Sequence, residues 1–171
     1  MADELDQAAQ GVVDHLHRLK VDFELMACDP ALADTTEFCA AYGIAPEDSA
    51  NTILVVGKSE PPVVVACVVL ATTRLDVNHV VRRRLNVKKC SFASADQTVG
   101  YTGMMIGGVT AFGLPVSIPV WVDAAVMARE RIVLGGGSRS WKIRCAPDAL
   151  TRLENLEVIE GLAGGTTATS A

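Results

Sequence analysis

The chain has 171 residues, of which 50% are hydrophobic and 20% are charged, and its formal net charge at pH 7 is -5. These values fit one globular domain, and they exclude a disordered chain or a uniformly cationic nucleic-acid-binding protein. The five cysteines are odd in number and share no CxxC spacing, so we expect reduced core cysteines and no disulfide framework.

The first part of the chain alternates helical and strand patterns. Apolar residues recur at helical spacing over residues 3–20, which predicts an amphipathic helix. A half-buried strand is expected in VDFELMA. A second helix follows in DPALADTTEFCAAYG, where Asp34 and Glu37 have capping-box spacing and Gly43 suits the helix end.

The middle of the chain predicts the centre of a sheet. The runs TILVVG and VVVACVVL are β-branched and nearly continuous in hydrophobicity, and the turn-rich KSEPP separates them. We therefore expect two paired central strands. Asp76 can cap the next helix, which should run through Leu85 and end at Asn86.

Shorter elements complete the pattern. After a strand near CSFA, Ser94 and Gln97 predict a capping box for a helical turn that Gly100 would end. IPVWVD, RIVLG and WKIRC predict three strands, with Asp123 capping the helix AAVMARE between the first two. A last helix is expected from Pro147.

The distribution of these elements predicts one domain over residues 1–160 and a flexible tail over residues 161–171, because the tail lacks periodicity. The acidic start MADELDQ lacks the regions of a signal peptide, and the longest apolar run, residues 63–71, is too short to span a bilayer. We therefore expect a cytoplasmic protein with no membrane partner.

The segment TGMMIGGVTAFG, residues 102–113, combines four glycines with bulky apolar residues. Backbone N–H groups at such turns can converge on one point and stabilise a phosphate or an oxyanion. The same glycines could instead only allow strands to cross. Neither GxGxxG nor the lysine-bearing phosphate loop is present, so the pattern alone favours the structural explanation.

Several motifs in one order carry a family resemblance. They are DTTEFCAAYGI, ANTILVV, RLDVNHVVRRRLNVKKCSFA, TGMMIGGVTAFG, IPVWVD and LGGGSRSWKI. Over roughly residues 10–155 the chain resembles the YbaK and prolyl-tRNA synthetase-associated editing domain. The resemblance implies a single α/β domain with a mixed β-sheet surrounded by helices. It also implies hydrolysis of mischarged aminoacyl-tRNA at the 3′ acceptor end, without a metal or another cofactor, and an aminoacyl-tRNA synthetase is a further candidate partner.

The same resemblance assigns the catalytic loop. The family's glycine loop falls on Gly107, Gly108, Val109, Thr110 and Ala111, whose backbone amides would stabilise the oxyanion formed when water attacks the ester. The family's usual proline in this loop is replaced by Ala111, which removes a fixed φ. The resemblance further implies that the terminal ribose hydroxyl of the substrate helps to place the water.

A second departure concerns charge. The family usually carries a lysine just before its first long central strand, and this chain has Asn51 there, a shorter and neutral contact. Lys58 lies beyond the strand, where a solvated turn residue is the better interpretation. The sequence therefore leaves open a deacylase with Asn51 as a weakened substrate contact, or a binding module that keeps the fold without the chemistry. A third hypothesis is a structural partner protein with an exposed apolar contact patch, although burial explains these loop residues more simply; they are Met104, Met105, Ile106 and Phe112.

Other candidate site residues have competing structural explanations. Asp123 could bind a ligand amine or only cap a helix. The residues Gly136, Gly137, Ser138 and Arg139 could form a second pocket wall or a tight turn. A basic cluster could bind tRNA phosphates or form a solvated helix end; its members are Arg82, Arg83, Arg84, Lys88 and Lys89. The histidine spacing predicts no metal site.

Overall fold

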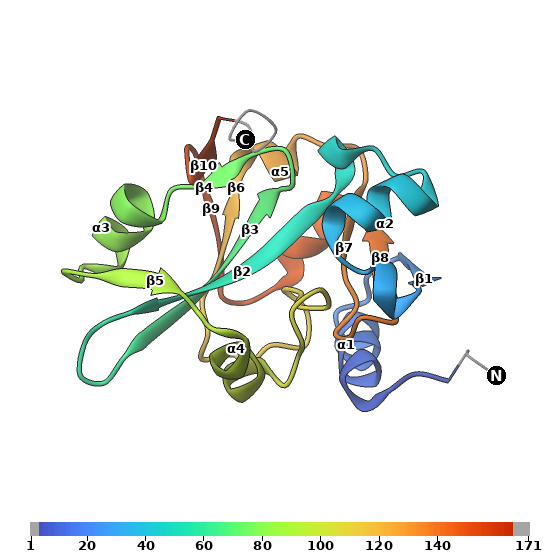
Figure 1. Ribbon diagram of the computed structural model, residues 1–171, viewed down its shortest axis with the longest axis horizontal. Helices are drawn as coiled ribbons and strands as arrows, with labels where there is room; N and C mark the ends of the chain where they lie inside the picture. The colour runs from blue at the N-terminus through green and yellow to red at the C-terminus, as the bar shows by residue number, and fades with distance from the viewer. Residues whose placement is uncertain (1–3, 166–171) are drawn as a thin grey trace.

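A long antiparallel hairpin forms the centre of the molecule (Figure 1). In the computed structural model, which describes residues 4–165, β2 (Ala50–Gly57) pairs with β3 (Val63–Leu70) along the full length of both strands. Most of their residues are buried on both faces, which explains their nearly continuous hydrophobic sequence. The predicted central pair is confirmed.

The strands of residues 4–165 form three sheets. The largest has the order β5-β2-β3-β6-β9, in which β3, β6 and β9 run parallel and the other neighbours run antiparallel. A three-stranded antiparallel sheet has the order β1-β8-β7, and β4 pairs with β10. The further strands are β1 (Phe23–Ala27), β4 (Arg74–Leu75), β5 (Cys90–Phe92), β6 (Val120–Asp123), β7 (Ile132–Gly135), β8 (Trp141–Cys145), β9 (Leu156–Ile159) and β10 (Ala163–Gly164).

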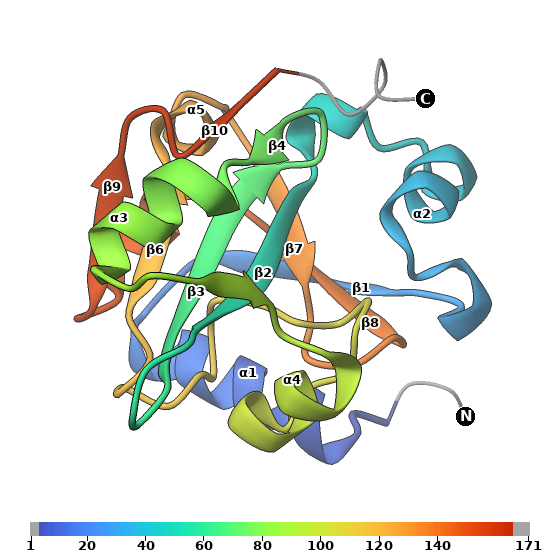
Figure 2. The ribbon, with the colours of Figure 1, turned by 60° about the vertical axis from the view of Figure 1, so that its left-hand side comes forward.

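Helices surround the mixed sheet, as Figure 2 shows, so the expected single α/β domain is confirmed. They are α1 (Gln7–Arg18), α2 (Thr35–Tyr42), α3 (Arg82–Leu85), α4 (Ala95–Thr102) and α5 (Ala124–Met127). Short 3₁₀ turns occupy residues 30–32, 46–48 and 147–152, and a π-helical turn over residues 77–81 leads into α3. None of the helices within residues 4–165 has the length and apolar composition needed to cross a membrane.

The two faces of the central hairpin bury separate cores. Leu54, Ala66 and Val68 contribute to one core together with Val12 and Leu16 of α1. This core also contains residues of the glycine segment and of the three-stranded sheet. The alternate hairpin residues pack with the π-helical turn on the opposite face, in a cluster that includes Val55, Val65, Cys67, Val81 and Leu162. Strand alternation therefore directs successive residues into different cores.

Helix caps agree with the sequence in most places. Asp76 accepts a hydrogen bond from the His79 N–H, and Ser94 forms the predicted capping box with Gln97. The predicted stop at Gly100 is wrong, because α4 continues to Thr102 and ends at Gly103, whose φ is +72°. A left-handed residue is what this type of helix end requires, and Gly100 is accommodated inside the helix.

The carboxyl-terminal part of the chain contains structure that the sequence pattern did not indicate. β9 lies at the edge of the mixed sheet, and β10 pairs Ala163 with Leu75 of β4. Leu162 is fully buried, so residues 161–165 of the expected flexible tail belong to the folded domain. The rest of that expected tail, residues 166–171, lies outside the described residues.

Candidate functional site

A cavity of about 400 Å³ lies where the start of β2 meets the glycine segment, the first turn of α2 and β8. This volume is within the range of small-molecule binding sites. More open hollows of about 520 and 550 Å³ occur beside the β2–β3 turn and beside Asp76, but none of the described residues that line them is a buried ionisable side chain. The first cavity contains such a residue, Lys142, and is therefore the better candidate site.

The glycine loop, defined here as Gly103–Gly113, forms one wall of this cavity. Ile106, Gly107 and Val109 line it. Gly107 has a φ of +94°, which favours glycine at this position. The Gly108 N–H donates to the Met105 carbonyl at 2.8 Å, whereas the N–H groups of Gly107 and Val109 find no acceptor within residues 4–165. Two residues of the cavity wall therefore have N–H groups without an internal acceptor.

Two cations hold consecutive carbonyl groups of the loop. Arg139 Nη1 donates to the Ile106 oxygen at 3.0 Å, and Lys142 Nζ donates to the Gly107 oxygen at 2.9 Å. The Ile106 carbonyl and the Gly107 N–H belong to one trans peptide, so they point in opposite directions. By binding the Ile106 carbonyl, Arg139 therefore also fixes the direction of the Gly107 N–H, which it does not contact.

Arg139 and Lys142 also tie the loop to the start of α2. Arg139 pairs with the Asp34 carboxylate at 3.0 Å, and Lys142 donates to the Ala33 carbonyl at 2.8 Å. The hydrogen bond from Arg139 lowers the pKa of Asp34. Asp34 is the N-cap residue of α2, but its side chain makes no capping hydrogen bond. The predicted capping box is therefore wrong, because the carboxylate pairs with Arg139 instead.

Lys142 is a functional candidate that the sequence analysis missed. It is only 7% exposed, and its Nζ lies 5.1 Å from the centre of the Phe38 ring. Burial lowers the pKa of Lys142, because desolvation disfavours the charged form. The available signal was weak, because Lys142 alternates with Arg144 in WKIRC, a pattern typical of the solvent-facing side of a strand.

Asn51 lines the same cavity from β2. Its Oδ1 accepts a hydrogen bond from the Thr35 hydroxyl at 2.8 Å, which connects β2 to the first turn of α2. The side-chain N–H groups of Asn51 have no acceptor within residues 4–165. The cavity thus brings together Asn51, Gly107 and Val109 from the predicted set.

The other predicted loop residues lie away from the cavity. Gly108 packs against the backbone of Ser138. Thr110 is fully buried and its hydroxyl has no hydrogen-bond partner within the described residues. Ala111 lines a separate hollow of about 270 Å³ beside His15. None of these three residues lines the candidate cavity.

The predicted second wall forms the β7–β8 turn behind the glycine loop. The Gly137 N–H donates to the Gly108 carbonyl at 2.7 Å, and the Gly136 N–H donates to the Trp141 carbonyl at 3.0 Å. The Ser138 hydroxyl donates to Asp6. The segment is therefore a tight turn that supports the glycine loop, and it lies outside the lining of the cavity, so its role as a second pocket wall stays a prediction.

Asp123 lies on β6, outside this cavity. It is buried and occupies the N-cap position of α5, but its side chain makes no capping hydrogen bond, so the predicted side-chain cap is wrong. Its Oδ1 instead accepts a hydrogen bond from the Ala163 N–H at 3.4 Å. Asp123 therefore contacts the carboxyl-terminal β10 segment. Its predicted contact with a ligand amine stays a prediction.

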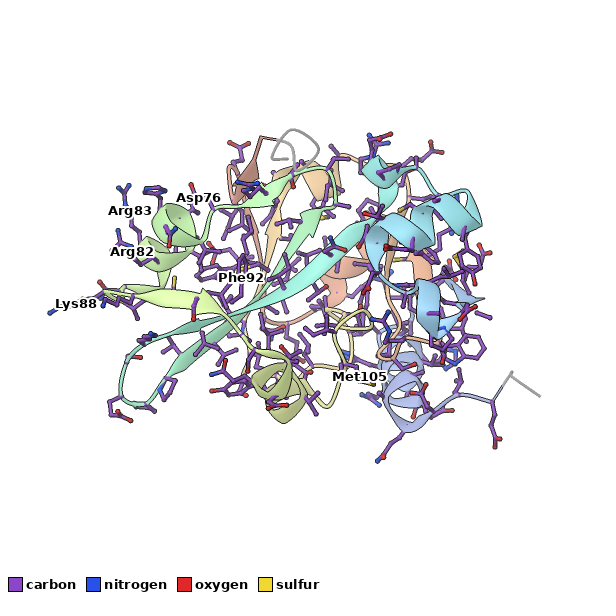
Figure 3. All side chains as sticks on the ribbon, viewed as in Figure 1. Asp76, Arg82, Arg83, Lys88, Phe92 and Met105 are labelled. Atoms are coloured by element: carbon purple, nitrogen blue, oxygen red, sulfur yellow. The ribbon has the colours of Figure 1, made fainter. Side chains whose placement is uncertain are left out.

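The basic cluster lies at one end of the molecule, where Figure 3 labels Arg82, Arg83 and Lys88. Arg84 pairs with Glu157 and lies 5.5 Å from the centre of the Trp121 ring, so its charge is already partnered. Phe92 lies between this end and the loop residue Met105 in the same view. The cluster is continuous in sequence with β5, which ends at Phe92 on the cavity wall.

Comparison with known proteins identifies the family. The profile described as "Aminoacyl-tRNA editing domain" matches residues 29–153, which is most of the chain. The chain belongs to the aminoacyl-tRNA editing domain family. The match spans every residue that lines the cavity. Mischarged aminoacyl-tRNA is the general substrate of this family.

Solved structures share the fold of this editing domain. One, of a protein proposed to be a trans-editing enzyme for prolyl tRNA synthetase, has a TM-score of 0.79 and 20% identity, and the match covers 92% of this chain and 98% of that chain. Another, of the hypothetical protein APE2540, has a TM-score of 0.80 and 21% identity, with 90% and 99% coverage. At these identities the likeness concerns the fold alone.

The side chains around the cavity are not arranged as metal ligands. Within residues 4–165 no group of three or more His, Cys, Asp or Glu side chains is placed to hold a metal ion. The polar groups that line the cavity are amides, hydroxyls, one carboxylate and one ammonium. The cavity thus offers both hydrogen-bond donors and acceptors to a ligand.

The close packing of Gly108 leads to a first prediction. A Cβ at this position would lie within 2.6 Å of the Ser138 Cα, and backbone atoms cannot move aside easily. Gly108→Ala should therefore lower the free energy of unfolding by about 1–3 kcal/mol in denaturant titrations. Gly100→Ala is the matched control, because nothing lies within 4 Å of its Cβ position inside α4, and it should leave stability unchanged or raise it. Equal losses in both variants would contradict this packing.

A second prediction concerns pH. His15 Nδ1 accepts the Gly113 N–H at 2.7 Å, and burial lowers the pKa of His15 below 6.5. As the pH falls, His15 therefore takes up a proton in the unfolded chain at a higher pH than in the folded chain. The contribution of this contact to stability is complete above about pH 6.5 and is lost as the pH falls below that value. Thermal melts from pH 7.5 to 5 should show a smaller pH dependence for His15→Ala than for wild type. Identical slopes would show that the contact does not depend on neutral His15.

Proposed function

We propose that this editing domain acts as a free-standing deacylase that hydrolyses the ester of mischarged aminoacyl-tRNA in trans. The observation that supports the proposal is the pair of free N–H groups at Gly107 and Val109, on the wall of a cavity that also contains Asn51. Preorganised amides of this kind stabilise an oxyanion without further reorganisation. The proposal therefore assigns catalysis to the backbone of the loop.

The reaction needs no protein nucleophile. Water adds to the carbonyl carbon of the ester, and negative charge grows on the carbonyl oxygen, which Gly107 and Val109 would stabilise. The tetrahedral intermediate then loses the ribose oxygen as the ester C–O bond breaks, and a proton from the water passes to that oxygen. The products are the free amino acid and a tRNA with an intact terminal ribose. Each donor is expected to contribute about 3–4 kcal/mol to lowering the barrier.

The acceptor end would approach along β5. Lys88 and Lys89 precede this strand, and Phe92 at its end is 57% exposed while also lining the cavity. Positive side chains attract phosphates, and an exposed aromatic ring can stack against a base. We propose that Phe92 stacks with the terminal adenine while the acylated ribose enters the cavity.

A second candidate function is a binding module with the same fold. The observation that favours it is Asn51, which is neutral at the position of the family lysine and whose Oδ1 is already bonded to Thr35. Such a protein would hold an aminoacyl, nucleotide or protein ligand without turnover. The two candidates differ in what wild-type protein does to an acyl ester.

The central prediction is therefore tested with a panel of mischarged aminoacyl-tRNAs. Wild-type protein should release amino acid from at least one member of the panel faster than the uncatalysed reaction, measured as loss of the labelled ester. Asn51→Lys is assayed in parallel. An inert wild type together with turnover by Asn51→Lys would favour the binding module and contradict the proposed deacylase.

If the acceptor end binds along β5, loss of its phosphate contacts should change KM and leave kcat nearly unchanged. Combining Arg83→Ala, Lys88→Ala and Lys89→Ala should raise KM with little change in kcat, because phosphate contacts act on binding. The slope of log affinity against log salt should become shallower by about 0.7 for each phosphate of the single-stranded acceptor end that these side chains no longer neutralise. Arg18→Ala on α1 serves as the charge control. A fall in kcat at constant KM would contradict this assignment.

A further inference from the structure

The cavity contains a cation whose charge is not neutralised locally. Lys142 Nζ donates to two neutral carbonyl groups, those of Ala33 and Gly107, and its third N–H has no acceptor within residues 4–165. The carboxylate of the cavity wall belongs to Asp34, which already pairs with Arg139. An ammonium buried in this way is costly unless an electron-rich group compensates it.

The positive charge of Lys142 is complementary to the negative charge that an acyl ester develops during hydrolysis. An acyl ester develops negative charge on its carbonyl oxygen during hydrolysis, and a buried ammonium stabilises such a charge more strongly than a neutral donor does. Lys142 holds the carbonyl of Gly107, so its charge is adjacent to the loop wall that carries the free N–H groups. Asn51 lines the cavity from a different sheet and brings no charge.

We propose that Lys142 of β8 supplies the positive charge of the acyl-ester site, in place of a lysine at position 51. The inference rests on the proposed deacylase function and deepens it. Lys142 directs its remaining N–H to the carbonyl oxygen of the ester, and its two bonds to backbone oxygens fix where that N–H points. The positive charge then lies on β8 of the three-stranded sheet, whereas a lysine at position 51 would place it on β2 of the mixed sheet. Both positions line the same cavity.

The neighbouring contacts support this assignment. Phe38 lies beside the ammonium, and an aromatic face favours a cation where water is excluded. Burial lowers the pKa of Lys142, while Asp34 is among the charges that favour its protonated form. A lysine needed only as surface charge would not occupy a position that is 7% exposed.

The test compares four proteins on the mischarged tRNA that wild type hydrolyses fastest. Lys142→Gln replaces the charged donor by a shorter, neutral amide, and it should lower kcat by about 100-fold, the lower end of the loss on removing an oxyanion donor. Arg144→Gln removes a cation two residues further along β8, outside the cavity, and should retain the wild-type kcat. The double variant Asn51→Lys with Lys142→Gln should regain roughly tenfold over Lys142→Gln, because it returns a charged donor to the cavity.

A measurement on wild-type protein does not depend on whether the variants fold. The Lys142 side-chain resonances should shift in NMR spectra when a hydrolysis-resistant 3′-aminoacylamino-adenosine is added. Active wild type with an equally active Lys142→Gln, or unshifted Lys142 resonances in the presence of bound analogue, would overturn this inference and leave the deacylase standing. Wild-type protein inert on the whole panel would overturn the deacylase and this inference with it.

Discussion

The geometry of the candidate site depends on two cations that bind neighbouring carbonyl groups of the glycine loop. Arg139 and Lys142 come from one hairpin, β7–β8, and bind the oxygens of Ile106 and Gly107. Hydrogen bonds from charged donors are about twice as strong as neutral ones. A glycine-rich loop has many accessible conformations, and these two bonds select the one in which the Gly107 N–H is left free.

The same hairpin connects the loop to the rest of the fold. Arg139 and Lys142 also bind Asp34 and Ala33 at the start of α2, and Asn51 at the start of β2 is bonded to Thr35 of that helix. A bridge between Ser49 and Val133 joins β2 to β7. The cavity is therefore enclosed by elements of both sheets, and its width is set by how the sheets meet. Strands β2, β5, β7 and β8 supply part of the wall of this candidate site, and the glycine loop, the start of α2 and α4 supply other parts.

Much of the fold could be predicted from local sequence. The β-branched runs that form β2 and β3 and the capping box at Ser94 each depend on residues close together in the chain. β9 and β10 were not predicted because their stability comes from partners elsewhere, β6 and β4. Asp34 was misassigned for the same reason, since Arg139 lies 105 residues away in sequence.

The candidate site could be predicted only in part. Glycine content indicated the loop, and the family resemblance indicated position 51, but neither showed which loop amides remain free. Gly107 and Val109 line the cavity, whereas Gly108 packs against Ser138 and Ala111 lines a hollow beside His15, and these contacts join residues far apart in sequence. Lys142 was missed because strand alternation gives the face of a residue without showing what that face contacts.

The most direct test is a crystal structure of the protein with a hydrolysis-resistant amide analogue of 3′-aminoacyl-adenosine. We expect the acyl carbonyl oxygen within hydrogen-bonding distance of the Gly107 N–H, inside the cavity bounded by Asn51 and Lys142. An analogue bound elsewhere on the protein, with this cavity closed by side chains, would contradict ester hydrolysis at the glycine loop.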